Sequence, residues 1–175
     1  MEGELRRLRF GPTTEDGRQR PFLVEVRFTA DEPGQVIADA RAVLTRVVER
    51  TGDWPDRERW PRLLPAWFIQ RCAPEPFRPE PGERVGAGAW LRRWRAMLPL
   101  QTADDEGPWT LSAWLHDFDP EGAGADRSWW WWHAGTDESG VGWIQVATTG
   151  CPFGSGSLYW LIEASGGRDL AYGGP

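Results

Sequence analysis

The sequence predicts a two-layer α+β fold, in which helices pack on an antiparallel sheet of about five strands. Three observations support this class. Residues 22–28 alternate apolar and polar side chains, residues 36–48 repeat apolar side chains at helical spacing, and the second half holds short aromatic segments between glycine-rich turns. Short turns between strands allow hairpins, so no crossover connections are needed.

Four consecutive tryptophans define the most distinctive strand, over residues 127–134. On a helix these indoles would cover every side, whereas on a strand they alternate between the two faces. Aromatic side chains also favour strands. We therefore expect a central strand with both faces covered. Alternation places two tryptophans with His133 on one face and two on the other: Trp129 and Trp131 with His133, against Trp130 and Trp132.

The N-terminal half is expected to contain two strands and one long helix. Residues 4–10 alternate and predict an edge strand, and residues 22–28 predict a half-buried strand. Residues 31–34, Asp-Glu-Pro-Gly, start a helix that ends at Gly52. The apolar residues of this helix share one face: Val36, Ile37, Ala40, Val43, Leu44, Val47 and Val48.

The middle of the chain, residues 53–81, is rich in proline and tryptophan, and we expect it to wrap partly around the domain. Within it, residues 64–69 form a short helix opened by Pro65. Residues 86–98 predict a further helix with its apolar residues on one side.

The second half predicts a meander of three strands, over residues 109–118, 127–134 and 141–148. Residues 158–164 then predict a last helix, with Ser155 and Ser157 as caps. We expect a single α+β domain over residues 1–166 and a flexible tail over residues 167–175.

Composition limits the classes of function. The formal net charge of -6 argues against nucleic-acid binding, which needs basic clusters. All 20 basic residues are arginine, as codon bias in a GC-rich genome would produce. We expect no signal peptide, because the first residues lack a basic region followed by an apolar core. No apolar run reaches membrane-spanning length, and the two cysteines do not suggest a disulfide framework. We expect a soluble cytoplasmic protein that binds no nucleic acid, membrane or cofactor, and whose oligomeric state the sequence leaves open.

Aromatic residues recur in short motifs over roughly residues 60–166. The motifs are Leu64-Pro65-Ala66-Trp67-Phe68, Trp90-Leu91 with Trp94, Trp109 with Trp114, Trp130-Trp131-Trp132, and Pro152-Phe153 before Leu158-Tyr159-Trp160-Leu161. Their spacing resembles that of a family of small tryptophan-rich proteins from GC-rich bacteria, on the size scale of one domain. No activity is assigned to that family, so the resemblance implies no catalytic residues. The chain is also similar to the tryptophan-rich modules of bacterial conflict systems.

The thirteen tryptophans, with few candidate acids, bases or metal ligands, favour binding over catalysis. Most indoles would fill the core, but any that face outward could bind a partner, because tryptophan and arginine are enriched at binding hot spots. We therefore predict a non-enzymatic interaction or adaptor domain, with a protein partner encoded nearby. The candidate binding residues are Trp114, His116, Trp130, Trp132, Trp143, Arg92 and Arg93.

Alternative functions stay open. Cys151 precedes a helix start, where a thiol becomes more acidic, and His133 could serve as its base in a thiol enzyme or small-molecule site. A buried, unreactive cysteine fits the same pattern. His116 and His133 with Asp117 or Asp119 could in principle bind a metal, but such loose patterns rarely do, and we predict no metal site. An immunity-type protein with an acidic surface could instead mask a basic partner.

Overall fold

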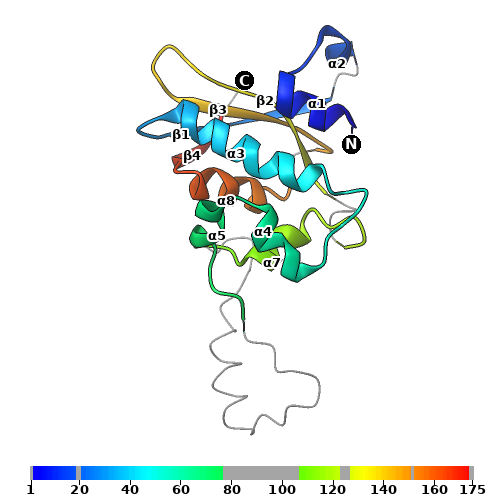
Figure 1. Ribbon diagram of the computed structural model, residues 1–175. Helices are drawn as coiled ribbons and strands as arrows, with labels where there is room; N and C mark the ends of the chain where they lie inside the picture. Colours follow the sequence, from blue (N-terminus) through cyan, green and yellow to red (C-terminus); the bar gives the residue numbers. More distant parts are fainter. Residues whose placement is uncertain (1, 19–20, 77–106, 123–126, 151, 174–175) are drawn as a thin grey trace, which may run out of the picture.

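The computed structural model describes residues 2–18, 21–76, 107–122, 127–150 and 152–173 (Figure 1). These residues form an α+β fold with an antiparallel sheet, which confirms the predicted class. Within them the sheet has four strands rather than five, in the order β2-β3-β1-β4.

The strands are β1 (Phe22–Thr29), β2 (Trp129–Thr136), β3 (Gly142–Thr148) and β4 (Arg168–Gly173). β1 pairs with β3 on one side and with β4 on the other, and a hairpin joins β2 to β3. The sequence predicted β1, β2 and β3, whose apolar and aromatic patterns are strong. β4 was not predicted.

Two helices cover one face of the sheet, α3 (Pro33–Val48) and α8 (Gly156–Ala164). Figure 1 shows both on the same side of the strands. All seven apolar residues predicted to share a face of α3 are buried, so the prediction of this helix is confirmed. α8 also agrees with the sequence, although Ser155 accepts no capping hydrogen bond through its side chain.

A further group of short helices packs on the side of α3 and α8 that faces away from the sheet (Figure 1). The 53–76 part of the predicted wrapper lies here and is largely helical, with Pro65 preceding α5 as predicted. The group consists of η1 (Arg57–Arg59), α4 (Trp60–Leu63), α5 (Ala66–Arg71) and α7 (Leu111–His116).

Two segments predicted as strands are helices. The edge strand expected over residues 4–10 is α1 (Glu2–Phe10), followed by the short α2 (Thr14–Arg18). The strand expected over residues 109–118 is α7, because Thr110 accepts a hydrogen bond from the Ala113 N–H and caps a helix start. The buried residues here follow helical spacing: Leu111, Trp114, Leu115 and Phe118.

The C-terminal segment expected as a loose tail contains β4, so that expectation is wrong for residues 168–173. The segment has little apolar alternation, and its pairing with the distant β1 makes it a strand. The predicted helix at residues 86–98 lies outside the described residues.

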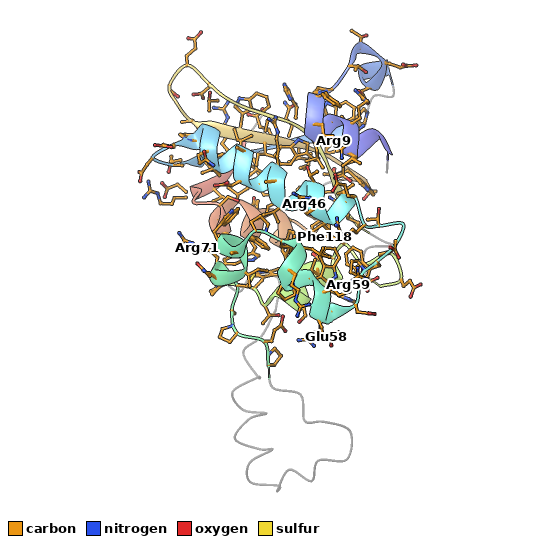
Figure 2. All side chains as sticks on the ribbon, viewed as in Figure 1. Arg9, Arg46, Glu58, Arg59, Arg71 and Phe118 are labelled. Atoms are coloured by element: carbon orange, nitrogen blue, oxygen red, sulfur yellow. The ribbon has the colours of Figure 1, made fainter. Side chains whose placement is uncertain are left out.

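Most of the tryptophans that the structure describes are core residues, as expected from the general tendency of large aromatic side chains to be buried. A continuous row of rings runs from the short helices to the sheet, with neighbouring centroids 4.6–5.8 Å apart. Phe118 lies inside the molecule within this row (Figure 2). The row consists of Phe68, Trp114, Phe118 and Trp129.

Candidate functional site

The face of the sheet opposite α3 and α8 holds the aromatic side chains that remain partly accessible. Alternation along β1 sends Val26 and Phe28 into the core, and Glu25 and Arg27 to the other side. No helix of the described residues covers β1 and β3 on that side. We call this surface the open face; its side chains are Leu23, Glu25, Arg27, Trp130, His133, Trp143, Gln145 and Ala147.

A bulge at Trp132 changes which residues of β2 reach the open face. Trp131 pairs with Val146, but His133 pairs with Gln145, so Trp132 is the extra residue. His133 therefore lies on the open face, and not on the face of Trp131 as the sequence alternation predicted.

Trp132 is itself buried and lies beneath α1. Its ring is 4.7 Å from the guanidinium carbon of Arg7. The cation covers the indole, so Trp132 is not available to a partner.

Trp143 is the central aromatic residue of the open face. It lies across Gly135 of the neighbouring strand, where an added Cβ would come within 2.7 Å of Trp143 Cζ2. Any other residue at position 135 would displace the indole. His133 packs edge-on against Trp143, with ring centroids 5.3 Å apart. Burial, and then the charge of Arg41, lower the pKa of His133, so the imidazole on this face is neutral at pH 7.

The outer edge of β2 is closed by side chains from α1. Glu4 Oε1 accepts a hydrogen bond from the Trp131 N–H (2.8 Å), and Arg7 Nε donates to the Trp131 carbonyl (3.1 Å). Arg127 forms two further bonds to Glu4, at 2.9 and 3.0 Å. Burial lowers the pKa of Arg127, and the charge of Glu4 opposes this. This buried pair fixes α1 against the strand.

The predicted binding residues fall into three groups. Trp130 and Trp143 are half-buried and lie on the open face. Trp114 is fully buried and donates to the Ser157 carbonyl (2.9 Å), and Trp132 is 7% exposed, so the structure does not bring either to the surface. His116 is exposed, but it ends α7 on the far side of the helices. Arg92 and Arg93 lie outside the described residues.

Sequence reasoning missed Leu23, which is 40% exposed on the open face. The sequence contains a signal that could have identified Leu23, because this residue stands at a solvent-facing position of the alternating strand 22–28. Phe10, 81% exposed at the end of α1, is also near this face, since the following Gly11 lies against His133.

Two adjoining cavities lie among the short helices. One has a volume of about 310 Å³ and the other about 480 Å³. They share three lining residues, Arg57, Ser112 and Leu115. Trp54, Trp60 and His116 are among the residues that line the smaller one.

Cys72 lines the larger cavity. Burial, and then the charge of Glu75, raise the pKa of this thiol to about 11. A thiol that stays protonated at neutral pH is a poor nucleophile.

Among the described residues, no cluster of side chains supports the alternative metal-binding or thiol-enzyme sites. His116 and His133 lie on opposite sides of the molecule, and no group of three or more His, Cys, Asp or Glu among the described residues could hold a metal ion. Burial raises the pKa of Asp117, and Ser157 opposes this by hydrogen bonding. Cys151 lies outside the described residues, so its pairing with His133 stays a prediction.

Comparison with known protein families, with curated proteins and with solved structures finds no match. Within the part of the chain that the structure describes, no helix has the length and apolar character needed to cross a bilayer.

Proposed function

We propose that this chain is a non-enzymatic protein-binding domain that holds another protein on the open face of its sheet. One observation is the main support. The face opposite α3 and α8 exposes parts of two tryptophans, Trp130 and Trp143, together with Leu23. Exposed apolar patches on soluble domains commonly mark interaction sites.

The chemistry of the open face suits a protein surface. Trp130 and Trp143 provide large rigid rings at low entropic cost, as at binding hot spots. Polar groups lie beside them: Gln145 donates to Glu25 (3.2 Å), and Arg27 donates to Asp137 (3.1 Å). An aromatic centre with a polar rim is the usual composition of such an interface.

The sequence also predicts that the Pro/Trp-rich segment, from Trp54 to Pro81, helps the aromatic sheet face to hold the partner, and the proposal omits this part of the prediction. The described part of the segment, residues 53–76, lies with the short helices and not on the open face. The proposal therefore assigns partner binding to the open face alone.

The test compares a variant of the open face with a matched control. Trp130→Ser with Trp143→Ser removes both indoles, and His116→Ser changes an exposed residue on the opposite side. Tagged wild-type protein would capture partners from an extract of the source organism, and products of neighbouring genes are the first to identify. A captured protein is then purified, and its affinity for each variant is measured by calorimetry.

We expect the double variant to bind at least about tenfold more weakly, as loss of hot-spot tryptophans usually causes, and His116→Ser to bind like the wild type. Equal affinity of all three proteins would exclude the open face. Affinity that falls steeply with salt would favour a basic partner, in agreement with the net charge of -6.

Small-molecule binding is a second candidate, favoured by the two cavities among the short helices. Their volumes of about 310 and 480 Å³ fall in the range of ligand sites. A thermal-shift screen against small aromatic compounds tests it. A genuine ligand would stabilise the wild type and Trp130→Ser but lose its effect on Trp54→Ala, which removes a cavity wall.

A further inference from the structure

The two edges of the sheet differ in how their backbone groups are satisfied. At the β2 edge, Glu4 and Arg7 bond the N–H and carbonyl of Trp131, and Arg41 Nη2 donates to the Ala134 carbonyl (3.4 Å). At the β4 edge, the described residues place no such cover over Leu170–Gly173. An uncovered edge strand is a template for pairing with another strand.

The alternation of ladder bonds shows which groups of β4 point outward. In the hairpin the Asp137 N–H donates to the Val141 carbonyl, so odd-numbered residues of β3 bond toward β2 and even-numbered ones toward β1. Even-numbered residues of β1 therefore bond toward β3, and odd-numbered ones toward β4. Because Arg27 pairs with Ala171 and Glu25 with Gly173, the backbone groups of residues 171 and 173 point toward β1. The N–H and C=O groups of Leu170 and Tyr172 therefore point away from the sheet.

The part of the β4 edge that could pair with another strand is short and well defined. The pairing of β1 with β4 shifts at Asp169, which has a φ of 53°. This bulge limits the regular edge to residues 170–173. Neither lysine nor proline, the residues that commonly block an edge, occurs there. Tyr172 remains 52% exposed, although its hydroxyl hydrogen-bonds Ser155 Oγ (3.2 Å).

The edge is complementary to itself. If two copies of β4 pair antiparallel with Ala171 on a twofold axis, Leu170 of each copy faces Tyr172 of the other. Both residues point their backbone groups outward, so the two pairs make about four hydrogen bonds. Leucine then meets tyrosine on the helix side, alanine meets alanine on the open-face side, and no like charges face each other.

We propose that the chain forms a homodimer through β4, with the two sheets joined into one continuous sheet about this axis. Cross-strand partners share a face, so the two open faces lie on the same side of the joined sheet. The remaining edges are both β2, which α1 closes. The assembly therefore stops at two copies and does not grow into a fibre.

This dimer would make partner binding bivalent, because it presents two open faces side by side. The inference does not depend on the proposed function, since β4 pairing uses backbone groups at the edge and not the tryptophans of the open face. The two proposals can therefore fail separately.

The test uses charge at position 171, where the side chain is exposed and faces its own copy across the axis. Ala171→Glu and Ala171→Lys each place like charges directly opposite each other, which destabilises the pair. Sedimentation velocity should show a dimer for the wild type and a dissociation constant raised about tenfold or more for each variant. An equimolar mixture of the two variants should recover the dimer, because opposite charges then meet.

Two further variants locate the interface. Tyr172→Pro removes an outward N–H while the inward bonds from residues 171 and 173 remain, and it should also weaken the dimer. Trp130→Ser, three strands away, should leave the dimer unchanged. A monomeric wild type at high concentration would overturn the inference. So would charged variants that dimerise normally, a mixture that stays monomeric, loss of the dimer in Trp130→Ser, or growth beyond two copies.

Discussion

At the scale of single residues, the contact that matters most for the fold is the buried ion pair of Glu4 and Arg127. Glu4 is 2% exposed, and its carboxylate accepts three hydrogen bonds, two from Arg127 and one from the Trp131 N–H. The Arg127 guanidinium also lies 4.6 Å from the ring centroids of Phe118 and Trp129. Removing one charge would leave the other buried without its counter-ion.

Glu4→Gln should therefore destabilise the protein by about 3–5 kcal/mol, the cost of breaking a buried pair. The matched control is Glu49→Gln, because Glu49 also ties α1 to the rest of the molecule, through the half-exposed Arg9. We expect it to cost about 1 kcal/mol or less, as for surface pairs. Urea unfolding measures both values. Equal costs for the two variants would show that burial does not set the strength of the pair.

The same contact explains one failure of sequence prediction. Strict alternation places His133 with Trp129 and Trp131, but the bulge at Trp132 reverses the face of His133. The bulged edge is satisfied by Glu4, 127 positions away from Trp131 in the sequence. A local pattern cannot report a partner so distant. Membership of the open face could therefore be predicted for β1, for β3 and for the residues of β2 before the bulge, but not for the residues of β2 after it.

At the scale of elements, the corner between α1 and α2 is organised by Asp16. Its carboxylate accepts hydrogen bonds from the Thr13 N–H (2.7 Å) and hydroxyl (2.9 Å), and from Arg6 and Arg7. The Thr13 N–H, followed by the Arg6 guanidinium, holds the pKa of Asp16 well below its ordinary value of 3.8. The corner is thus stabilised only while the carboxylate is ionised.

This gives a pH dependence with a definite sign. The folded state binds a proton at Asp16 less readily than the unfolded state, so the stabilisation is complete above about pH 5 and is lost as the pH falls through 3.8 and below. Asp16→Asn should be less stable than the wild type at pH 7, and the difference should shrink toward pH 2. Urea midpoints over this range measure it. A difference that stays constant with pH would contradict the assignment.

How well each element could be predicted depends on whether one period dominates its sequence. The apolar residues of α3, from Val36 to Val48, fit only a helix, and β1 fits only a strand. The segment of α7 fits both. Trp114, His116 and Phe118 alternate like a strand, while Leu111, Trp114, Leu115 and Phe118 follow helical spacing. The hydrogen bond from the Ala113 N–H to the Thr110 hydroxyl favours the helix, but a threonine at this position does not by itself distinguish a helix from a strand in the sequence.

At the scale of the whole molecule, β4 shows why the C-terminal segment was misjudged as a tail. Arg168–Gly173 has no strong pattern of its own, and it becomes a strand because β1 has an unpaired edge beside it. Leu170 packs on the core, and Tyr172 contacts both Phe153 and Tyr159 of the helix side. A segment held by such contacts contributes to the stability of the entire sheet.

Deletion of residues 168–175 tests this contribution, with deletion of residues 174–175 as the control. The longer deletion exposes the edge of β1 and removes the packing of Leu170 and Tyr172, so we expect a loss of at least about 3 kcal/mol. The newly bare edge should also promote aggregation, because β1 would offer unpaired groups beside the exposed Phe22 and Leu23. Urea unfolding at low protein concentration and light scattering measure these effects. If both truncated chains unfold at the midpoint of the full chain, β4 is no more than the loose tail that the sequence suggested, and the dimer interface proposed on it loses its foundation.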